Sequence, residues 1–234
     1  MRVWVVLSCL AGCGRLAFDP LVDPLAMTDA SSTGDGARDG ASDGASPMTC
    51  TTEPFDTPDV QWMFYADAGF STMFTGGELR FAIPPNSNGY TGVNLVPVRD
   101  FTGGRVTIEV PQVSASANAE ISMTLSLDAN NAYSILYSEN DVVLSRRLNG
   151  VQDAMVTRLY SATEHRWWRM EHLAGTNAVE LATSPDNASW MVWLNTPATI
   201  PVTAMTLRLE SGEYLGGAPS PGNPRFDNLT YCLR

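Results

Sequence analysis

Apolar and polar residues alternate through the sequence from Thr51 onward, and this period of two is the pattern of β-strands. In the clearest run, residues 121, 123, 125 and 127 are apolar, while the residues between them are Ser or Thr. No segment keeps the apolar spacing and caps of a helix, so the pattern excludes a mainly helical fold. The segments expected to form strands are 60–65, 78–83, 92–98, 105–110, 120–127, 132–137, 142–148, 154–160, 166–173, 178–183, 190–194, 203–210 and 225–232.

Some dozen short strands separated by turns predict a two-sheet antiparallel β-sandwich of the jelly-roll type. We place this all-β domain at residues 50–234, a length that suits one domain with one core. The chain is acidic, with a formal net charge of −11. Nucleic-acid binding needs a basic face that displaces phosphate counterions, so no nucleic-acid partner is expected.

One hairpin is expected between residues 165 and 194. A turn at Gly175-Thr176 pairs residue 172 with 179 and residue 170 with 181, because this register brings the apolar faces of both strands together. The same register places Glu171 opposite Glu180.

The hairpin begins with the residues WWR (167–169), continues through an S-P-D-N turn (184–187) to Trp190, and is followed near the C-terminus by RFDNL (225–229). This arrangement resembles the concanavalin A-like lectin/glucanase superfamily over about residues 55–234. The resemblance implies a jelly roll. It does not select one function, since the fold serves lectins, glucanases and adhesion modules.

The N-terminus has the features of an export signal. Arg2 precedes a short apolar run, and Leu10-Ala11-Gly12-Cys13 looks like the lipobox of bacterial lipoproteins. That resemblance implies a signal peptide at residues 1–12, a diacylglycerol on Cys13 and attachment to the bacterial cell envelope, with the outer membrane favoured over the inner. The alternative is an apolar N-terminus that happens to contain a cysteine.

Residues 13–49 form the expected link between anchor and domain. Asp-Gly-Ala recurs every four residues between positions 35 and 45, and this composition predicts a disordered tether. The spacing does not match the calcium loop of an EF-hand. Beyond the tether, Cys50 and Cys232 flank the domain, which predicts a disulfide in an exported protein; two unpaired thiols are the alternative.

Catalytic patterns were sought and not found. Glucanases of the superfamily carry E-x-D-x-E on one strand, and the nearest match, Glu139 to Val143, has valine at the second Glu position. Glu171 and Glu180 form another acid pair, which Arg169 would neutralise on a solvent-facing surface. No G-x-S-x-G motif occurs in the expected domain at residues 50–234, and the two histidines do not form a zinc-ligand cluster. We therefore expect no enzymatic activity and no metal cofactor, although Asp128, Asn130 and Asn131 form a turn that is either a structural calcium site or an Asx turn.

Sugar binding needs an aromatic ring with hydrogen-bonding neighbours. Trp167 and Arg169 are the main candidates, with Glu171 and Glu180 beside them, and Tyr133, Tyr137, Trp190 and Trp193 are further aromatic candidates. The expected function is therefore a lipid-anchored surface protein with a non-catalytic glycan-binding or adhesion domain. The alternatives are a polysaccharide-active glycosidase and a structural envelope protein without a ligand.

Overall fold

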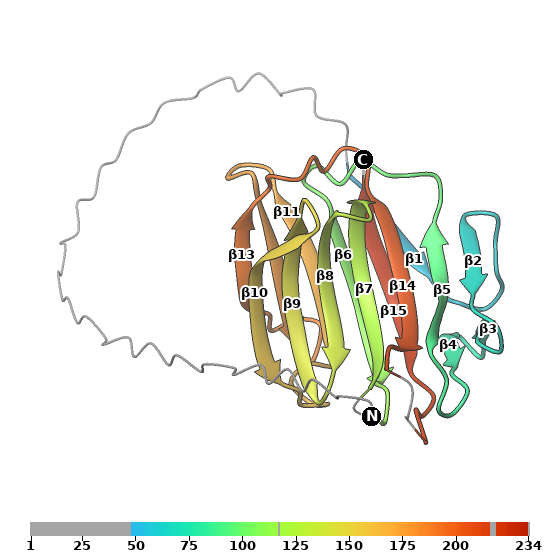
Figure 1. Cartoon of the computed structure of the whole chain (residues 1–234). Coiled ribbons are helices and arrows are strands. Elements are labelled where there is room, and N and C mark those ends of the chain that lie inside the picture. The colour runs from blue at the N-terminus through green and yellow to red at the C-terminus, as the bar shows by residue number, and fades with distance from the viewer. Residues whose placement is uncertain (1–47, 117, 216–218, 234) are drawn as a thin grey trace, which may run out of the picture. The chain divides into compact units, whose positions relative to one another are not determined.

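Two antiparallel sheets form the domain in the computed structural model, which describes residues 48–116, 118–215 and 219–233 (Figure 1). Sheet A has the strand order β13-β12-β11-β6-β15-β4-β3, and β1 also pairs with β15. Its strands are β1 (Thr49–Glu53), β3 (Ser71–Thr75), β4 (Glu78–Ala82), β6 (Arg105–Gln112), β11 (Trp167–Leu173), β12 (Ala178–Ser184), β13 (Met191–Pro197) and β15 (Arg225–Leu233).

Sheet B has the order β10-β9-β8-β7-β14-β5-β2. Its strands are β2 (Trp62–Ala66), β5 (Gly89–Leu95), β7 (Ala119–Asp128), β8 (Asn131–Ser138), β9 (Asp141–Leu148), β10 (Val151–Leu159) and β14 (Thr206–Glu213). The predicted all-β sandwich is confirmed. Within the described residues, no helix is long and apolar enough to cross a membrane.

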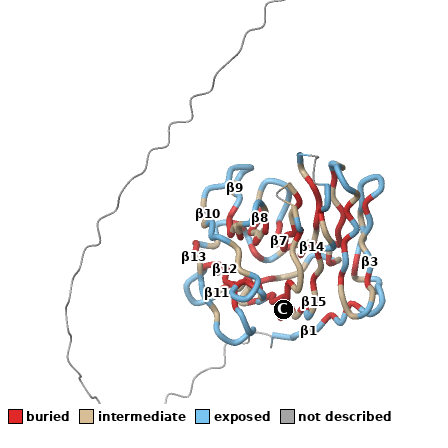
Figure 2. The backbone as a smooth tube through the Cα atoms, turned by 90° about the horizontal axis from the view of Figure 1, so that it is seen from below, coloured by how far each residue is buried: buried red, intermediate tan, exposed pale blue. Residues whose placement is uncertain are grey.

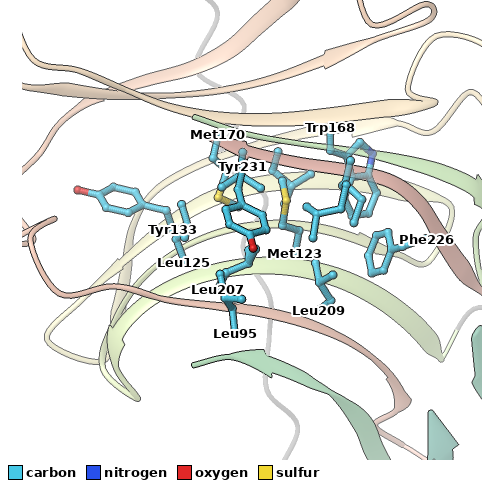
Figure 3. Packing of buried hydrophobic residues seen from close by; sticks show 14 of the residues in the cluster. Leu95, Met123, Leu125, Tyr133, Trp168, Met170, Leu207, Leu209, Phe226 and Tyr231 are labelled. Atoms are coloured by element: carbon cyan, nitrogen blue, oxygen red, sulfur yellow. The ribbon is translucent and has the colours of Figure 1, made fainter. Parts of the chain in front are cut away.

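The core lies between the sheets and is built from the inward residue of each alternating pair (Figure 2). Trp168 of β11 packs edge to face against Phe226 of β15, with ring centroids 5.9 Å apart. Met123 and Leu209 from sheet B belong to the same apolar cluster (Figure 3). Because one face of each strand supplies this core, the opposite face forms the outer surface of its sheet.

Two strands and several boundaries differ from the sequence prediction. Strands β1 and β3 were not predicted, because neither shows a clear apolar alternation. The segment expected to start at residue 60 starts at Trp62, and β13 starts at Met191 rather than Trp190. The turn before β13 is longer because the Asp186 carboxylate accepts backbone hydrogen bonds from Ala188 and Ser189.

A disulfide joins Cys50 and Cys232, which are direct partners in the pairing of β1 with β15. The predicted covalent link is therefore confirmed, and Cys50 lies within a strand instead of preceding the first one. The predicted signal peptide, Cys13 and the tether up to residue 47 lie outside the described residues.

Candidate active site

The predicted ligand-binding residues meet on the outer face of sheet A. Glu171 and Glu180 are direct cross-strand partners, as expected. The Arg169 guanidinium lies between them, with nitrogen–oxygen distances of 3.4 Å to Glu171 and 3.6 Å to Glu180. Trp167 is half-buried on the same face of β11. Both acids are thus ion-paired with the same arginine, which offsets one of their two negative charges.

Several other residues considered in the sequence lie away from this cluster, in the core or in turns. Tyr133 and Tyr137 are buried in the core and cannot present a ring to a sugar, because their position in β8 points them between the sheets. Glu139 lies in the turn before β9. The Asp128 carboxylate accepts hydrogen bonds from the backbone of Asn130 (2.7 Å) and from the amide of Asn131 (3.0 Å), so its oxygens serve an Asx turn.

The outer face of sheet B holds a groove that the sequence did not reveal. It has a volume of about 270 Å³ and runs along β7 and β8, with β14 on one side and β9 on the other. Ser122, Ser126 and Ser145 are buried although they point away from the core, which shows that this face is hollowed. Half of its lining residues are serines, a threonine and the arginines 147 and 208, and the carboxylates of Glu120, Asp128 and Glu210 line it as well.

Glu210 is the end point of one row of residues across three strands. Tyr65 of β2 pairs with Gly92 of β5, and Gly92 pairs with Glu210 of β14. Because Gly92 has no side chain, the Tyr65 ring lies over it, and the phenol donates a 2.6 Å hydrogen bond to Glu210. Arg208 lies 3.7 Å from the same carboxylate, and Ser122 donates to it at 3.4 Å.

Glu120 ends a second row with the same design. Tyr90 of β5 pairs with Gly212 of β14, and Gly212 pairs with Glu120 of β7. The Tyr90 ring covers Gly212, and its phenol hydrogen bonds to the Glu120 carboxylate. A side chain at either glycine would overlap the tyrosine, so the glycines are what let each phenol reach an acid one strand further on.

The electrostatics of these rows raise the pKa of two phenols and of one carboxyl group. Burial raises the pKa of Glu120 above its ordinary value, and the charge of Glu210 raises it further, while the hydrogen bond from Tyr90 acts in the opposite direction. Burial, followed by the neighbouring carboxylates, raises the pKa of both Tyr65 and Tyr90 far above the usual value. Both tyrosines therefore remain hydrogen-bond donors across the physiological pH range.

The spacing of the two acids suits chemistry on a glycosidic bond. Glu210 pairs with Ser122, two residues from Glu120, so the acids are diagonal neighbours on adjacent strands. The Cβ atoms of such neighbours are separated by somewhat less than about 7–8 Å. Glycosidases use two carboxyl groups about 5–9.5 Å apart, one of them with a raised pKa. The register thus brings the two acids near each other on one face in unequal environments, as a pair of glycosidase carboxyl groups needs.

Glu120 and Glu210 were missed because both acids were sought on one strand or one hairpin. The available signal was alternation: Glu120 opens the outward positions of the 120–127 run, and Glu210 ends the alternating run T-L-R-L-E (206–210). No pattern within the sequence indicates that these two runs are neighbours, because β14 returns to β7 from far along the chain.

Solved structures with the same fold include both enzymes and lectins. The chain is similar to a β-glucanase of Bacillus licheniformis, with a TM-score of 0.59 and 12% identity over 79% of this chain and 98% of that chain. It is similar to the Crh5 transglycosylase in complex with NAG, with a TM-score of 0.60 and 12% identity over 79% and 84% of the two chains. It is also similar to the Ca²⁺/Man2-bound exoplasmic/lumenal domain of VIP36, with a TM-score of 0.57 and 10% identity over 80% of this chain and 89% of that chain.

These similarities show the concanavalin A-like jelly-roll fold that the sequence motifs indicated. No protein-family model matches the sequence, and no curated protein matches it. The expectation of a non-catalytic domain is corrected: the structures that share its fold include a β-glucanase and a transglycosylase. That expectation depended on the absence of a suitable acid pair, and the groove holds one.

Proposed function

We propose that this chain is a polysaccharide-active enzyme that cleaves or transfers glycosidic bonds in the groove of sheet B. The observation that carries the proposal is the placement of Glu120 and Glu210 as diagonal neighbours in unequal environments. The β-glucanase, the transglycosylase and the Man2-bound domain that share the fold are named for acting on or binding carbohydrate, which supports a glycan as the substrate class.

Glu120 takes the role of general acid, because burial raises its pKa and so favours the protonated form that donates to the leaving oxygen of the scissile bond. The Glu210 carboxylate faces the reacting sugar, and it either attacks the anomeric carbon or activates a water that does so. Tyr65 and Arg208 orient this carboxylate through their hydrogen bond and ion pair. The serine and threonine hydroxyls of the groove supply hydrogen bonds to neighbouring sugar units.

The test is turnover by the full chain on soluble β-1,3-1,4-glucan, xyloglucan and N-acetylglucosamine oligomers. Released reducing ends report hydrolysis, and mass spectrometry of the products reports transfer. Glu120→Gln removes the acid with little change in shape, and Glu78→Gln on sheet A is the control for loss of a surface carboxylate. Release by the wild type that Glu120→Gln abolishes supports the proposal; wild-type protein inert on all three substrates, or Glu120→Gln as active as wild type, contradicts it.

We also propose that Cys13 is lipidated and anchors the chain to the bacterial cell envelope, with the outer membrane favoured. The order Leu10-Ala11-Gly12-Cys13 after a short apolar run supports this placement. Mass spectrometry of membrane-extracted protein should find a modified N-terminal Cys13, and Cys13→Ala should release the chain or leave it as precursor. Soluble protein with an unmodified residue 1 would refute the anchor without bearing on the groove.

A further inference from the structure

A second pocket, of about 430 Å³, opens near the edge of sheet A, and none of its lining residues lines the groove. Its position is set by the segment before β11, the end of β12 and the start of β13. We call it the tryptophan pocket, and its main lining residues are His165, Thr183, Ser189, Trp190, Met191 and Trp193. Its size lies within the usual range for small-ligand sites, about 300–1,000 Å³.

Both indole rings are held in place by cations. The Arg169 guanidinium lies 4.8 Å from the centre of the Trp190 ring, and Arg169 is itself held by Glu171 and Glu180. Arg158 lies 4.8 Å from the centre of the Trp193 ring. The ion-paired cluster on sheet A therefore orders one wall of this pocket, and a ligand meets rings that are already positioned.

Two polar side chains, those of Thr183 and His165, lie among the apolar residues that line the tryptophan pocket. The Trp193 indole donates to Thr183 Oγ1 at 2.9 Å, which leaves the Thr183 hydroxyl proton free to donate. His165 is 3% exposed and its Nδ1 accepts the backbone N–H of Ser161 at 2.9 Å. The proton of the neutral ring is then on Nε2, and burial lowers the pKa of His165, which favours that neutral form.

We propose that the tryptophan pocket binds a neutral sugar unit of a polysaccharide and so gives the domain a second carbohydrate site. The apolar face of a sugar ring packs on an indole, while its hydroxyls meet the hydroxyls and the imidazole N–H. Each indole already has a guanidinium against its ring, so a cationic ligand would gain no cation–π contact on that face, and Glu164 is the one acidic residue among the described residues that line the pocket. This site is separate from Glu120 and Glu210 and stands whether or not the groove is catalytic.

Intrinsic fluorescence distinguishes this pocket from the groove, because two tryptophans line the pocket and none of the described tryptophans lines the groove. Trp62, Trp167 and Trp168 also fluoresce, so the variants below assign the signal. The titration uses the full chain with Glu120→Gln, to prevent turnover, and the same β-1,3-1,4-glucan, xyloglucan and N-acetylglucosamine oligomers. At least one probe should change the fluorescence and slow migration in a gel that contains it. Adding Trp190→Ala should weaken binding roughly tenfold, as expected for the loss of one stacked ring.

Two further variants keep the inference falsifiable. Trp193→Phe retains a ring and should weaken binding less than Trp190→Ala does. Val192→Ala changes the neighbouring exposed residue of β13, which does not line the pocket, and should bind as the parent does. Circular dichroism and the melting temperature of each variant confirm that it is folded.

Binding that is unchanged in folded Trp190→Ala, or absent for all three probes, contradicts the inference. Loss of binding in Trp167→Ala with no loss in Trp190→Ala would also contradict it and would place the sugar on the outer face of β11. Binding that depends on Trp190, together with a wild-type chain that turns over none of the three substrates, would refute only the proposed enzymatic function. Turnover without such binding would refute only the tryptophan pocket.

Discussion

Tyr90 and Glu120 lie on strands separated by β14 and are joined across Gly212, over which the tyrosine ring lies. Tyr65 reaches Glu210 across Gly92 in the same way. In each row the glycine has no side chain, so the tyrosine ring lies over it and its phenol reaches the acid beyond it. The orientation of both acids in the groove thus depends on backbone positions that carry no functional group.

Replacing Gly212 by Ala should therefore disturb the groove. The added Cβ would overlap the Tyr90 ring and the carbonyl oxygen of Gly89, and overpacking of this kind costs about 1–3 kcal/mol of unfolding free energy. Gly175→Ala is the matched control, since no atom lies within 4 Å of its added Cβ. Urea unfolding of both variants measures the difference, and a Gly212→Ala chain as stable as the control would show that the Tyr90 ring does not lie where described.

The pKa of Glu120 should respond in opposite directions to two substitutions. Tyr90→Phe removes a hydrogen bond to the ionised carboxylate and should raise the pKa further, while Glu210→Gln removes a negative charge and should lower it. Carbon NMR of the Glu120 side chain against pH measures both shifts. Shifts of the same sign in the two variants would contradict the described environment.

A raised pKa also has a consequence for stability. The folded state holds the Glu120 proton more tightly than the unfolded chain does, so this group stabilises the fold below its unfolded pKa. That contribution is lost as the pH rises through the folded pKa. The unfolding free energy of Glu120→Gln should accordingly fall less than that of wild type over this pH interval, and an equal fall in both proteins would argue against a raised pKa.

Breaking the link between Cys50 and Cys232 should destabilise the domain without changing its fold. The disulfide closes a loop with a sequence separation of 182 residues, and its removal releases the unfolded chain from that constraint. The expected loss is roughly 2–4 kcal/mol of unfolding free energy. Guanidinium unfolding of the double variant Cys50→Ala/Cys232→Ala measures it, and an unchanged midpoint would show that the link carries no stability.

The sequence predicted the fold class and the pairing of β11 with β12, because alternation identifies the inward face of a strand and burial then sets the register. It did not predict β1, whose residues TCTTE have no apolar alternation and join sheet A by pairing with β15. The acid pair was out of reach for a different reason. Glu120 and Glu210 become neighbours only through the pairing of β7 with β14, which no local pattern specifies.

The aromatic candidates show the same limit. Trp167 and Arg169 were placed on the correct face of β11, since neighbouring residues of a strand alternate between faces. Alternation does not tell which outward residues contact each other. In the structure, Arg169 forms ion pairs with two carboxylates and lies against the Trp190 ring. The role of Trp167 in sugar binding stays a prediction, and Trp167→Ala in the fluorescence titration measures it.

The most direct test of the central claim compares kcat/KM for Glu120→Gln and Glu210→Gln on a polysaccharide and on an aryl glycoside with a good leaving group. A general acid contributes about 10²–10⁴-fold, and it is needed least when the leaving group departs without a proton. Glu120→Gln should thus lose that factor on the polysaccharide but little on the aryl glycoside, whereas Glu210→Gln should lose activity on both. Wild-type rates in both variants, or a loss that follows Glu171→Gln instead, would contradict the assignment of catalysis to the groove of sheet B.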